Sequence, residues 1–185
     1  MTFMDLQRLN QQINQLDDEP PFDSWQPENC GDIDIVIKQD GTWWHEGSPI
    51  GRKNLVKLLA RVLIKEGDDY FLKTPAEKMR IQVEDAPFVI TSWQTLTDDD
   101  ESTHIEVTTN LDRNFIVSQE HPISVNHENP DDPSLYVECH RGLLAKVHRN
   151  VYYQWIEMAT EQTINNQSHL IVNSAGSKFS LGMLE

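Results

Sequence analysis

The sequence is poor in cysteine and contains no long apolar run. Cys30 and Cys139 stand far apart without a CxxC pair, so we expect neither a disulfide framework nor a zinc knuckle, and both thiols should be reduced. No apolar run approaches the roughly 20 residues of a membrane span. The start of the chain lacks the basic and apolar regions of a signal peptide. These absences predict a cytoplasmic protein.

Basic residues are scarce as well. The chain has 15 Lys and Arg residues against 30 Asp and Glu residues, which gives a formal net charge of −15. A field of this sign repels phosphate backbones and anionic lipid surfaces. We therefore expect neither nucleic acid nor a membrane as a partner.

The familiar catalytic motifs are missing. There is no P-loop, GxGxxG or HExxH motif, and the serine within residues 47–51 is one position out of frame for a nucleophile elbow. Cys139 and His140 are neighbours on a predicted strand, so their side chains should point to opposite faces and could not share one ion. The sequence thus predicts no metal site, no cofactor and no catalytic residue, and it favours a non-catalytic protein over an enzyme.

The sequence does contain enough apolar residues for a folded core, since 38% of its residues are hydrophobic. Apolar residues at helical spacing predict helices over residues 3–16 and 52–66, and a third that is capped by Asn150. Thr74 and Glu77 match a capping box, which predicts a short helical turn. Alternating apolar residues predict strands over 33–38, 42–45, 69–73, 79–83, 88–93, 105–109, 135–139, 143–147, 169–173 and 178–184.

The two halves of the chain share a pattern. Ile33, Ile35 and Ile37 alternate as Ile105, Val107 and Thr109 do, and the turn residue Asp40 falls on Asp112. This match predicts an α+β protein with two similar halves, in which segments 33–46 and 105–118 are equivalent. We expect an N-terminal helix and connector over 1–21, an α+β domain over 22–92 and a second domain over 93–185. The second domain should be a curved antiparallel sheet or barrel closed by a helix, as in pleckstrin-homology folds.

Four longer phrases carry a family resemblance: PPFDSWQPENCGDIDIVI, DGTWWHEGSPIGRKNLVKLLARVL, YFLKTPAEKMRIQVEDAPF and VECHRGLLAKVHRNVYYQW. Together, over roughly residues 18–160, they resemble the bacterial domain-of-unknown-function family 1285. The resemblance implies a duplicated core and a C-terminal half superficially like pleckstrin-homology folds. It also implies a possible site between the halves for a nucleotide-like molecule in signalling. It implies no catalytic mechanism.

Six residues are candidates for ligand binding, and each has a structural alternative. Lys78 could meet an anionic ligand and Asp85 a sugar hydroxyl or a cation, although Glu77 and Lys78 could simply be an exposed cap and an exposed charge. Arg141 and Arg149 belong to a basic cluster that could bind a carboxylate or a phosphate, or could pair with internal acids. Two aromatic residues, Trp43 and Tyr152, could stack on a base or belong to the core.

The leading hypothesis is a non-catalytic protein that binds a small anionic, possibly nucleotide-like ligand between its two halves. Lys78, Arg141 and Arg149 are expected to converge there, with Trp43 or Tyr152 as an apolar wall. One alternative is a protein-interaction module that uses its pleckstrin-homology-like half to grip a peptide, and another is a hydrolase of a nucleotide derivative. A protein partner therefore stays open beside the small ligand.

Overall fold

The computed structural model describes residues 6–129, 131 and 133–184. The chain divides into two compact units, Met1–Asp85 and Ala86–Glu185, which we call unit 1 and unit 2 and describe separately. The boundary lies earlier than the predicted one at 92/93, because the strand β7 (Phe88–Thr97) runs through that position. The predicted helix over 3–16 is observed as α1 (Leu6–Ile13), and its residues 3–5 lie outside the described range.

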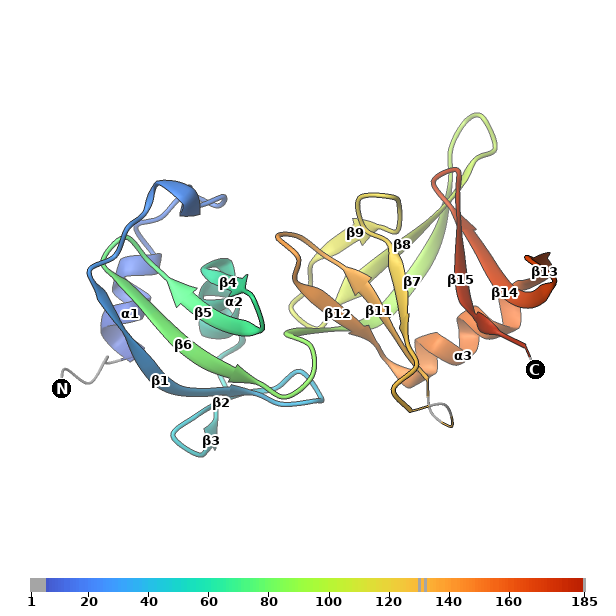
Figure 1. The fold of residues 1–185 in the computed structure, drawn as a ribbon. Helices are drawn as coiled ribbons and strands as arrows, with labels where there is room; N and C mark the ends of the chain where they lie inside the picture. The colour runs from blue at the N-terminus through green and yellow to red at the C-terminus, as the bar shows by residue number, and fades with distance from the viewer. Residues whose placement is uncertain (1–5, 130, 132, 185) are drawn as a thin grey trace. The chain divides into compact units, whose positions relative to one another are not determined.

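Unit 1 contains a six-stranded sheet in the order β3-β2-β1-β6-β5-β4 (Figure 1). The chain forms one antiparallel meander of three strands, then a second one, and the two meanders join where β1 and β6 pair in parallel. The strands are β1 (Asn29–Ile37), β2 (Trp43–His45), β3 (Ser48–Pro49), β4 (Leu63–Glu66), β5 (Asp69–Lys73) and β6 (Glu77–Val83).

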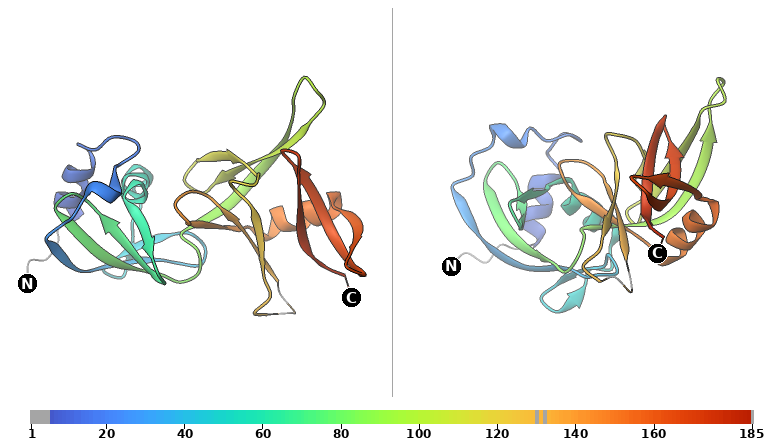
Figure 2. Two further views of the ribbon diagram at one scale, coloured as in Figure 1. Left: turned by 45° about the horizontal axis from the view of Figure 1, so that its top comes forward. Right: turned by 45° about the vertical axis from the view of Figure 1, so that its right-hand side comes forward.

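The core of unit 1 lies between this sheet and two helices. Figures 1 and 2 show α1 and α2 (Lys53–Arg61) together on one face of the sheet. Fully buried side chains come from both layers, among them Leu9, Ile13, Leu59, Ile35 and Leu72. Burial of such a side chain contributes roughly 1.5–3 kcal/mol. The opposite face of the sheet carries charged residues, and the connector to β1 includes a short 3-10 helix, η1 (Phe22–Ser24).

The predicted helix over 52–66 is too long. It ends at Arg61, and residues Leu63–Glu66 form the strand β4 instead. The apolar spacing continues through Leu63, but this residue pairs with Leu72 of β5, and Gly67 turns the chain with φ +60°. Pairing with a neighbouring strand has therefore overridden the local helical pattern.

The predicted helical turn at Thr74–Glu77 is also wrong, although the two residues do interact. The backbone N–H of Glu77 donates to Oγ1 of Thr74 at 3.1 Å, as in a capping box. The N–H of Thr74 donates in turn to the carbonyl of Glu77 at 2.8 Å. These bonds close a tight β-turn between β5 and β6, so the same side-chain bond serves a hairpin.

Unit 2 contains a six-stranded sheet and a three-stranded one. The larger sheet has the order β10-β11-β12-β7-β8-β9, and the smaller has the order β13-β14-β15. Its further elements are β8 (Thr103–Thr109), β9 (Asn114–Ile116), β10 (Ile123–Asn126), β11 (Ser134–Glu138), β12 (Leu144–Val147), α3 (Arg149–Met158), β13 (Thr160–Ile164), β14 (Gln167–Ser174) and β15 (Ser177–Met183).

Two details of unit 2 differ from the prediction. The helix α3 is capped by His148, whose Nδ1 accepts from the backbone N–H of Asn150 at 3.2 Å, so Asn150 itself is not the cap. The strands β10 and β13 were not predicted, because β10 has only four residues and the largely exposed residues of β13 lack an apolar alternation. Figure 2 shows α3 and the small sheet beside the β7–β8 hairpin.

A buried serine joins the two sheets of unit 2. Oγ of Ser174 accepts from the backbone N–H of Ile105 at 2.8 Å and donates to the carbonyl of Val117 at 2.6 Å. The next residue, Ala175, donates its backbone N–H to the carbonyl of Thr103 at 3.1 Å. The end of β14 is thus anchored by two hydrogen bonds to β8 and by a third to Val117, the residue after β9. Within the described residues the sheets do not close into the predicted barrel.

The large sheets of the two units share one strand order. If β7 is matched to β1 and each later strand to its counterpart, both sheets consist of two meanders joined by a parallel pair, β1–β6 in unit 1 and β12–β7 in unit 2. The predicted equivalence of segments 33–46 and 105–118 is therefore wrong, because β1 is the first strand of its meander and β8 is the second. The two halves do share a topology. The counterpart of β1 is β7, however, which is one strand earlier than the β8 that the sequence match selected.

Candidate functional site

The six predicted ligand-binding residues are divided between the two units. Trp43, Lys78 and Asp85 belong to unit 1, and the other three, Arg141, Arg149 and Tyr152, belong to unit 2. Each group is described within its own unit. The hollows of unit 1 provide the geometry of the candidate site.

Lys78 lies on β6 and interacts with two side chains of unit 1. Its ammonium group forms an ion pair with Glu66, and its Nζ lies 4.5 Å from the centroid of the Phe71 ring. The side chain is 22% exposed. A carboxylate and a ring face both stabilise the ammonium group here, so the charge of Lys78 is offset within unit 1.

Trp43 belongs to the core of unit 1, because it is only 2% exposed. Its Nε1 is buried and has no hydrogen-bond partner among the described residues. The adjacent Trp44 is half-buried, and its Nε1 donates to Oγ1 of Thr42 at 3.0 Å. Successive residues of a strand point to opposite faces, so only one of these two rings is in the core.

Asp85 lies near Tyr70 of β5. Burial raises the pKa of the Tyr70 hydroxyl, and the negative charge of Asp85 raises it further. Both effects disfavour the phenolate, so Tyr70 stays a neutral hydrogen-bonding group at neutral pH. Asp85 thus faces a phenol within unit 1.

In unit 2, Arg141 and Arg149 lie at opposite ends of β12. Arg141 occupies the turn before this strand with φ +54°, and Arg149 is the first residue of α3 after it. A four-residue strand spans about 13 Å at roughly 3.3 Å per residue. Tyr152 packs edge-on against Tyr153, with their ring centroids 5.7 Å apart. The strand therefore separates the two arginines along unit 2.

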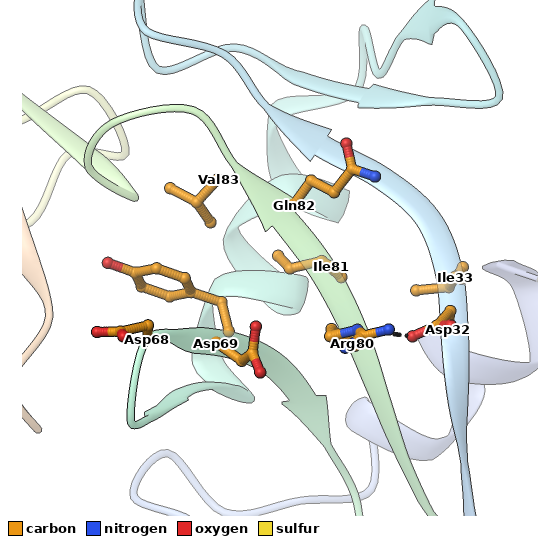
Figure 3. A pocket seen from close by; sticks show the side chains of 9 residues that line it. Asp32, Ile33, Asp68, Asp69, Arg80, Ile81, Gln82 and Val83 are labelled. Carbon is orange, nitrogen blue, oxygen red and sulfur yellow. Dashed lines mark hydrogen bonds and ion pairs between the residues drawn. The ribbon is translucent and has the colours of Figure 1, made fainter.

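Three adjoining hollows lie on unit 1, and Asp32 of β1 lines all of them. We call them the Asp32 hollows. Their cavity volumes are about 460, 950 and 320 Å³. Figure 3 shows the first, where side chains from β1, β6 and the β4–β5 turn border an open depression. Its lining residues include Asp32, Asp68, Asp69, Tyr70 and Arg80.

An ion pair crosses the outer surface of the sheet between these hollows. Nε of Arg80 donates to Oδ1 of Asp32 at 2.8 Å, as the dashed line in Figure 3 marks. The hydrogen bond and the charge of Asp32, together with the charge of Asp69, raise the pKa of the Arg80 guanidinium. Both partners remain open to solvent, with 52% and 69% of their side chains exposed.

The largest hollow is rich in acids. Its carboxylates come from Glu28, Asp32, Asp34, Glu46 and Glu77, while Arg8 and His45 are its basic lining residues. Most of these groups are exposed, whereas Glu77 is only 6% exposed.

Glu77 is held by the helix α1. Nε2 of Gln12 donates to its Oε2 at 3.4 Å, and Nη1 of Arg8 lies 4.0 Å from its Oε1. Oγ1 of Thr74 donates to Oε1 of Gln12 at 2.8 Å and so orients that amide. This network fixes the acid at the inner end of the hollow.

This arrangement suits recognition of a cation. Several carboxylates on one surface concentrate negative potential and attract positively charged groups. Among the described residues, no cluster of three or more His, Cys, Asp or Glu side chains is arranged to hold a metal ion. The described α-helices include none that is long and apolar enough to cross a bilayer.

Asp32, Asp69 and Arg80 were not among the residues predicted from the sequence. A signal was present, since Asp32 and Asp34 alternate with isoleucines in the phrase DIDIVI. Alternation places such acids together on one face of a strand. This sequence does not show which strand pairs with β1 or in which register. The ion pair with Arg80 of β6 therefore could not be predicted.

Two family models match the chain. The N-terminal domain of the domain of unknown function DUF1285 matches residues 20–86, and the C-terminal domain of the protein of unknown function DUF1285 matches residues 87–181. A search of curated proteins finds no match. The boundary between the two matches lies within one residue of the boundary between the units.

Two solved structures are similar to the chain. A DUF1285 family protein from Silicibacter pomeroyi DSS-3 is 29% identical with a TM-score of 0.82, over 95% of each chain. A DUF1285 family protein from Shewanella baltica OS155 is 30% identical with a TM-score of 0.54, over 66% of this chain and 90% of that one. The first likeness extends over both units.

Proposed function

Since the chain belongs to the DUF1285 family, we propose a function from its own surface: a non-catalytic binding protein whose Asp32 hollows receive a cationic group of a protein partner. The observation that carries this proposal is the acidic lining of the largest hollow. Of the three functions that the sequence left open, a protein-interaction module agrees best with this surface, but the surface lies on unit 1 and not on the C-terminal half that the sequence favoured.

The charges of unit 1 argue for a cation. Lys78 is paired with Glu66 and Arg80 with Asp32, so these two cations are offset by their own neighbours. An incoming anion would have to compete with those carboxylates. An incoming lysine or arginine side chain would instead meet Glu28, Asp34 and Glu46, and the net charge of −15 would favour its approach.

The test is a titration of the full chain with a hexalysine peptide, capped at both ends, followed by calorimetry. We expect binding that weakens as salt is added, because exposed charges are screened over about 10 Å at 0.1 M salt. The triple variant Glu28→Gln, Asp34→Asn, Glu46→Gln should raise the Kd about tenfold, as the loss of several exposed ion pairs would.

The matched control is the triple variant Asp99→Asn, Glu101→Gln, Glu161→Gln. It removes the same number of charges from exposed positions of unit 2. Equal weakening by both triple variants would show that only net charge matters, and the proposed site would be rejected. A capped hexaglutamate peptide that binds as well as hexalysine would also contradict the proposal.

The anionic-ligand hypothesis stays a prediction, as do the role in signalling, the cytoplasmic location and the pleckstrin-homology-like character of unit 2. The cations of that hypothesis are Lys78, which pairs with Glu66, and Arg141 and Arg149, which lie at the two ends of β12. Thermal-shift screening against nucleotides tests it, since a ligand at 100 times its Kd adds about 2.7 kcal/mol of stability.

A further inference from the structure

The first half of β1 has an open edge. β6 pairs with β1 on one side from Asn29 onward, but β2 pairs with it on the other side only over Ile35–Ile37 (Figure 1). Among the described residues, no strand pairs with that side of residues 29–33. Every second residue of a strand directs its N–H and C=O to the same edge. This part of β1 therefore presents unpaired backbone groups to solvent.

A specific turn keeps this edge open. The ladder between β1 and β2 ends where the N–H of Glu46 donates to the carbonyl of Asp34 at 3.1 Å. Glu46 and Gly47 then both adopt positive φ, +48° and +78°, between the paired residues His45 and Ser48. Two positive φ angles at the centre of a two-residue hairpin loop define a type I′ turn. The chain folds back on β2 and does not continue along β1.

The largest Asp32 hollow lies at this open edge. It is lined by consecutive residues of β1, from Asn29 to Asp34, and by His45 and Glu46 at the end of β2. It also contains side chains from both faces of the sheet, such as the buried Met79 and the exposed Gln82. Its cavity volume of about 950 Å³ is at the upper end of the range for ligand sites.

We propose that a basic, extended segment of a partner protein binds here by adding a strand to the open edge of β1, alongside the residues that β2 does not pair with. The proposal rests on the cation-binding function given above and specifies how the partner binds. Backbone hydrogen bonds to residues 29–33 supply affinity. Lysine or arginine side chains of the added strand meet Glu28, Asp34 and Glu46, which select a basic sequence.

A second copy of this chain is a poorer occupant. Pairing two β1 edges would bring the acids of one copy against those of the other, and like charges across a strand pair are destabilising. Charged residues on an edge strand commonly prevent such self-association. The same acids that exclude a second copy therefore favour a basic strand.

The test uses two peptides of equal charge and length. The first is a capped heptapeptide of alternating lysine and valine, which favours an extended strand. The second has the same sequence with a methyl group on every backbone nitrogen, which removes its hydrogen-bond donors and keeps its charge. Fluorescence anisotropy gives the Kd of each for the full chain, and hydrogen exchange of residues 29–33 is measured with and without the first peptide.

We expect the first peptide to bind at least tenfold more tightly than the methylated one, and to slow amide exchange in residues 29–33. The variant Asp34→Asn should raise the Kd of both peptides about threefold, and the control Asp99→Asn should not. If both peptides bind equally and Asp34→Asn still weakens them, the cationic site stands and strand addition is overturned.

If neither peptide binds, the proposed function itself fails, and with it the strand addition. Sedimentation then tests whether a second copy of this chain occupies the edge. A dimer that forms with rising protein concentration and that the first peptide dissociates would assign the edge to a second copy. That result would overturn the proposal of a basic partner.

Discussion

In unit 2, the guanidinium of Arg113 donates to Nε2 of His140, with 3.2 Å between the nitrogens. Because arginine has no acceptor, the imidazole must carry its proton on Nδ1, which is buried without a hydrogen-bond partner among the described residues. The ring of Phe88 stacks on the imidazole at a centroid distance of 6.1 Å. This environment stabilises the neutral ring.

The pH dependence of stability should reflect this contact. Burial, and then the charge of Arg113, lower the pKa of His140 from 6.5 to about 3. Above pH 6.5 both the folded and the unfolded states hold a neutral imidazole. Between pH 6.5 and about 3 the unfolded state binds a proton that the folded state does not, so the free energy of unfolding falls as the pH falls.

The variant His140→Phe removes that titrating group and should reduce the difference in stability between pH 7 and pH 5. Urea unfolding at the two pH values gives the measurement. The control Phe88→Leu changes the same cluster without removing a titrating group, so it should lower the stability equally at both values. An unchanged difference in His140→Phe would show that other groups cause the acid sensitivity.

Arg80 competes with any incoming cation for Asp32. The variant Arg80→Gln should therefore tighten hexalysine binding about threefold, because the carboxylate at 2.8 Å loses its partner. The melting temperature should change little, since the ion pair is exposed. Lys178→Gln, at an exposed position of unit 2, is the matched control. If both variants tighten binding equally, net charge explains the effect and competition at Asp32 does not.

The buried hydroxyl of Thr74 connects α1 to the β5–β6 turn. Its replacement in Thr74→Val keeps the shape but leaves Oε1 of Gln12 and the N–H of Glu77 without this partner. Such a loss costs about 1–3 kcal/mol, which urea unfolding can measure. Thr97→Val, on an exposed strand position, should stay within about 0.5 kcal/mol. Equal effects of the two substitutions would argue against the connecting role.

Replacement of Ser174 should lower the free energy of unfolding more than replacement of Ser177, its partner across the β14–β15 turn. Ser174→Ala removes the hydroxyl that joins β14 to Ile105 and Val117, and should cost about 1–3 kcal/mol. Ser177→Ala, at the partly exposed partner position, serves as the control. Amide exchange at Ile105 should accelerate only in the first variant. Protection of that amide in Ser174→Ala would contradict the assignment.

Local pattern predicted most strands and the pairing of neighbours such as β1–β2 and β14–β15, but not the pairing of strands that are distant in sequence. Residues 69–73 were correctly predicted, and residues 79–83 lie within the observed β6, because alternation and turn residues determine such hairpins. Leu63 was wrongly placed in a helix, because its spacing fits both structures and only its pairing with Leu72 decides. The capping box at Thr74 failed for a related reason, since one side-chain bond can close either a helix or a tight turn.

The candidate site depends on contacts that are distant in sequence. Asp32 and Arg80 lie 48 positions apart and meet only because β1 and β6 pair in parallel. The sequence shows the acids of DIDIVI, but not which strand lies beside them. Trp43 was a reasonable candidate for stacking, and its burial depends on the helices that cover its face of the sheet.

The parallel pairs at the centre of the two large sheets have a kinetic consequence. In each unit these central neighbours are the first and the last strand of the sheet in chain order. Each sheet centre therefore carries a high contact order, which slows folding. A nascent chain that has emerged only as far as β5 can form local hairpins but has no β6 to pair with β1. Unit 1 should therefore reach its native core in one late, cooperative step, after synthesis has passed Val83, and only then should unit 2 begin the same sequence.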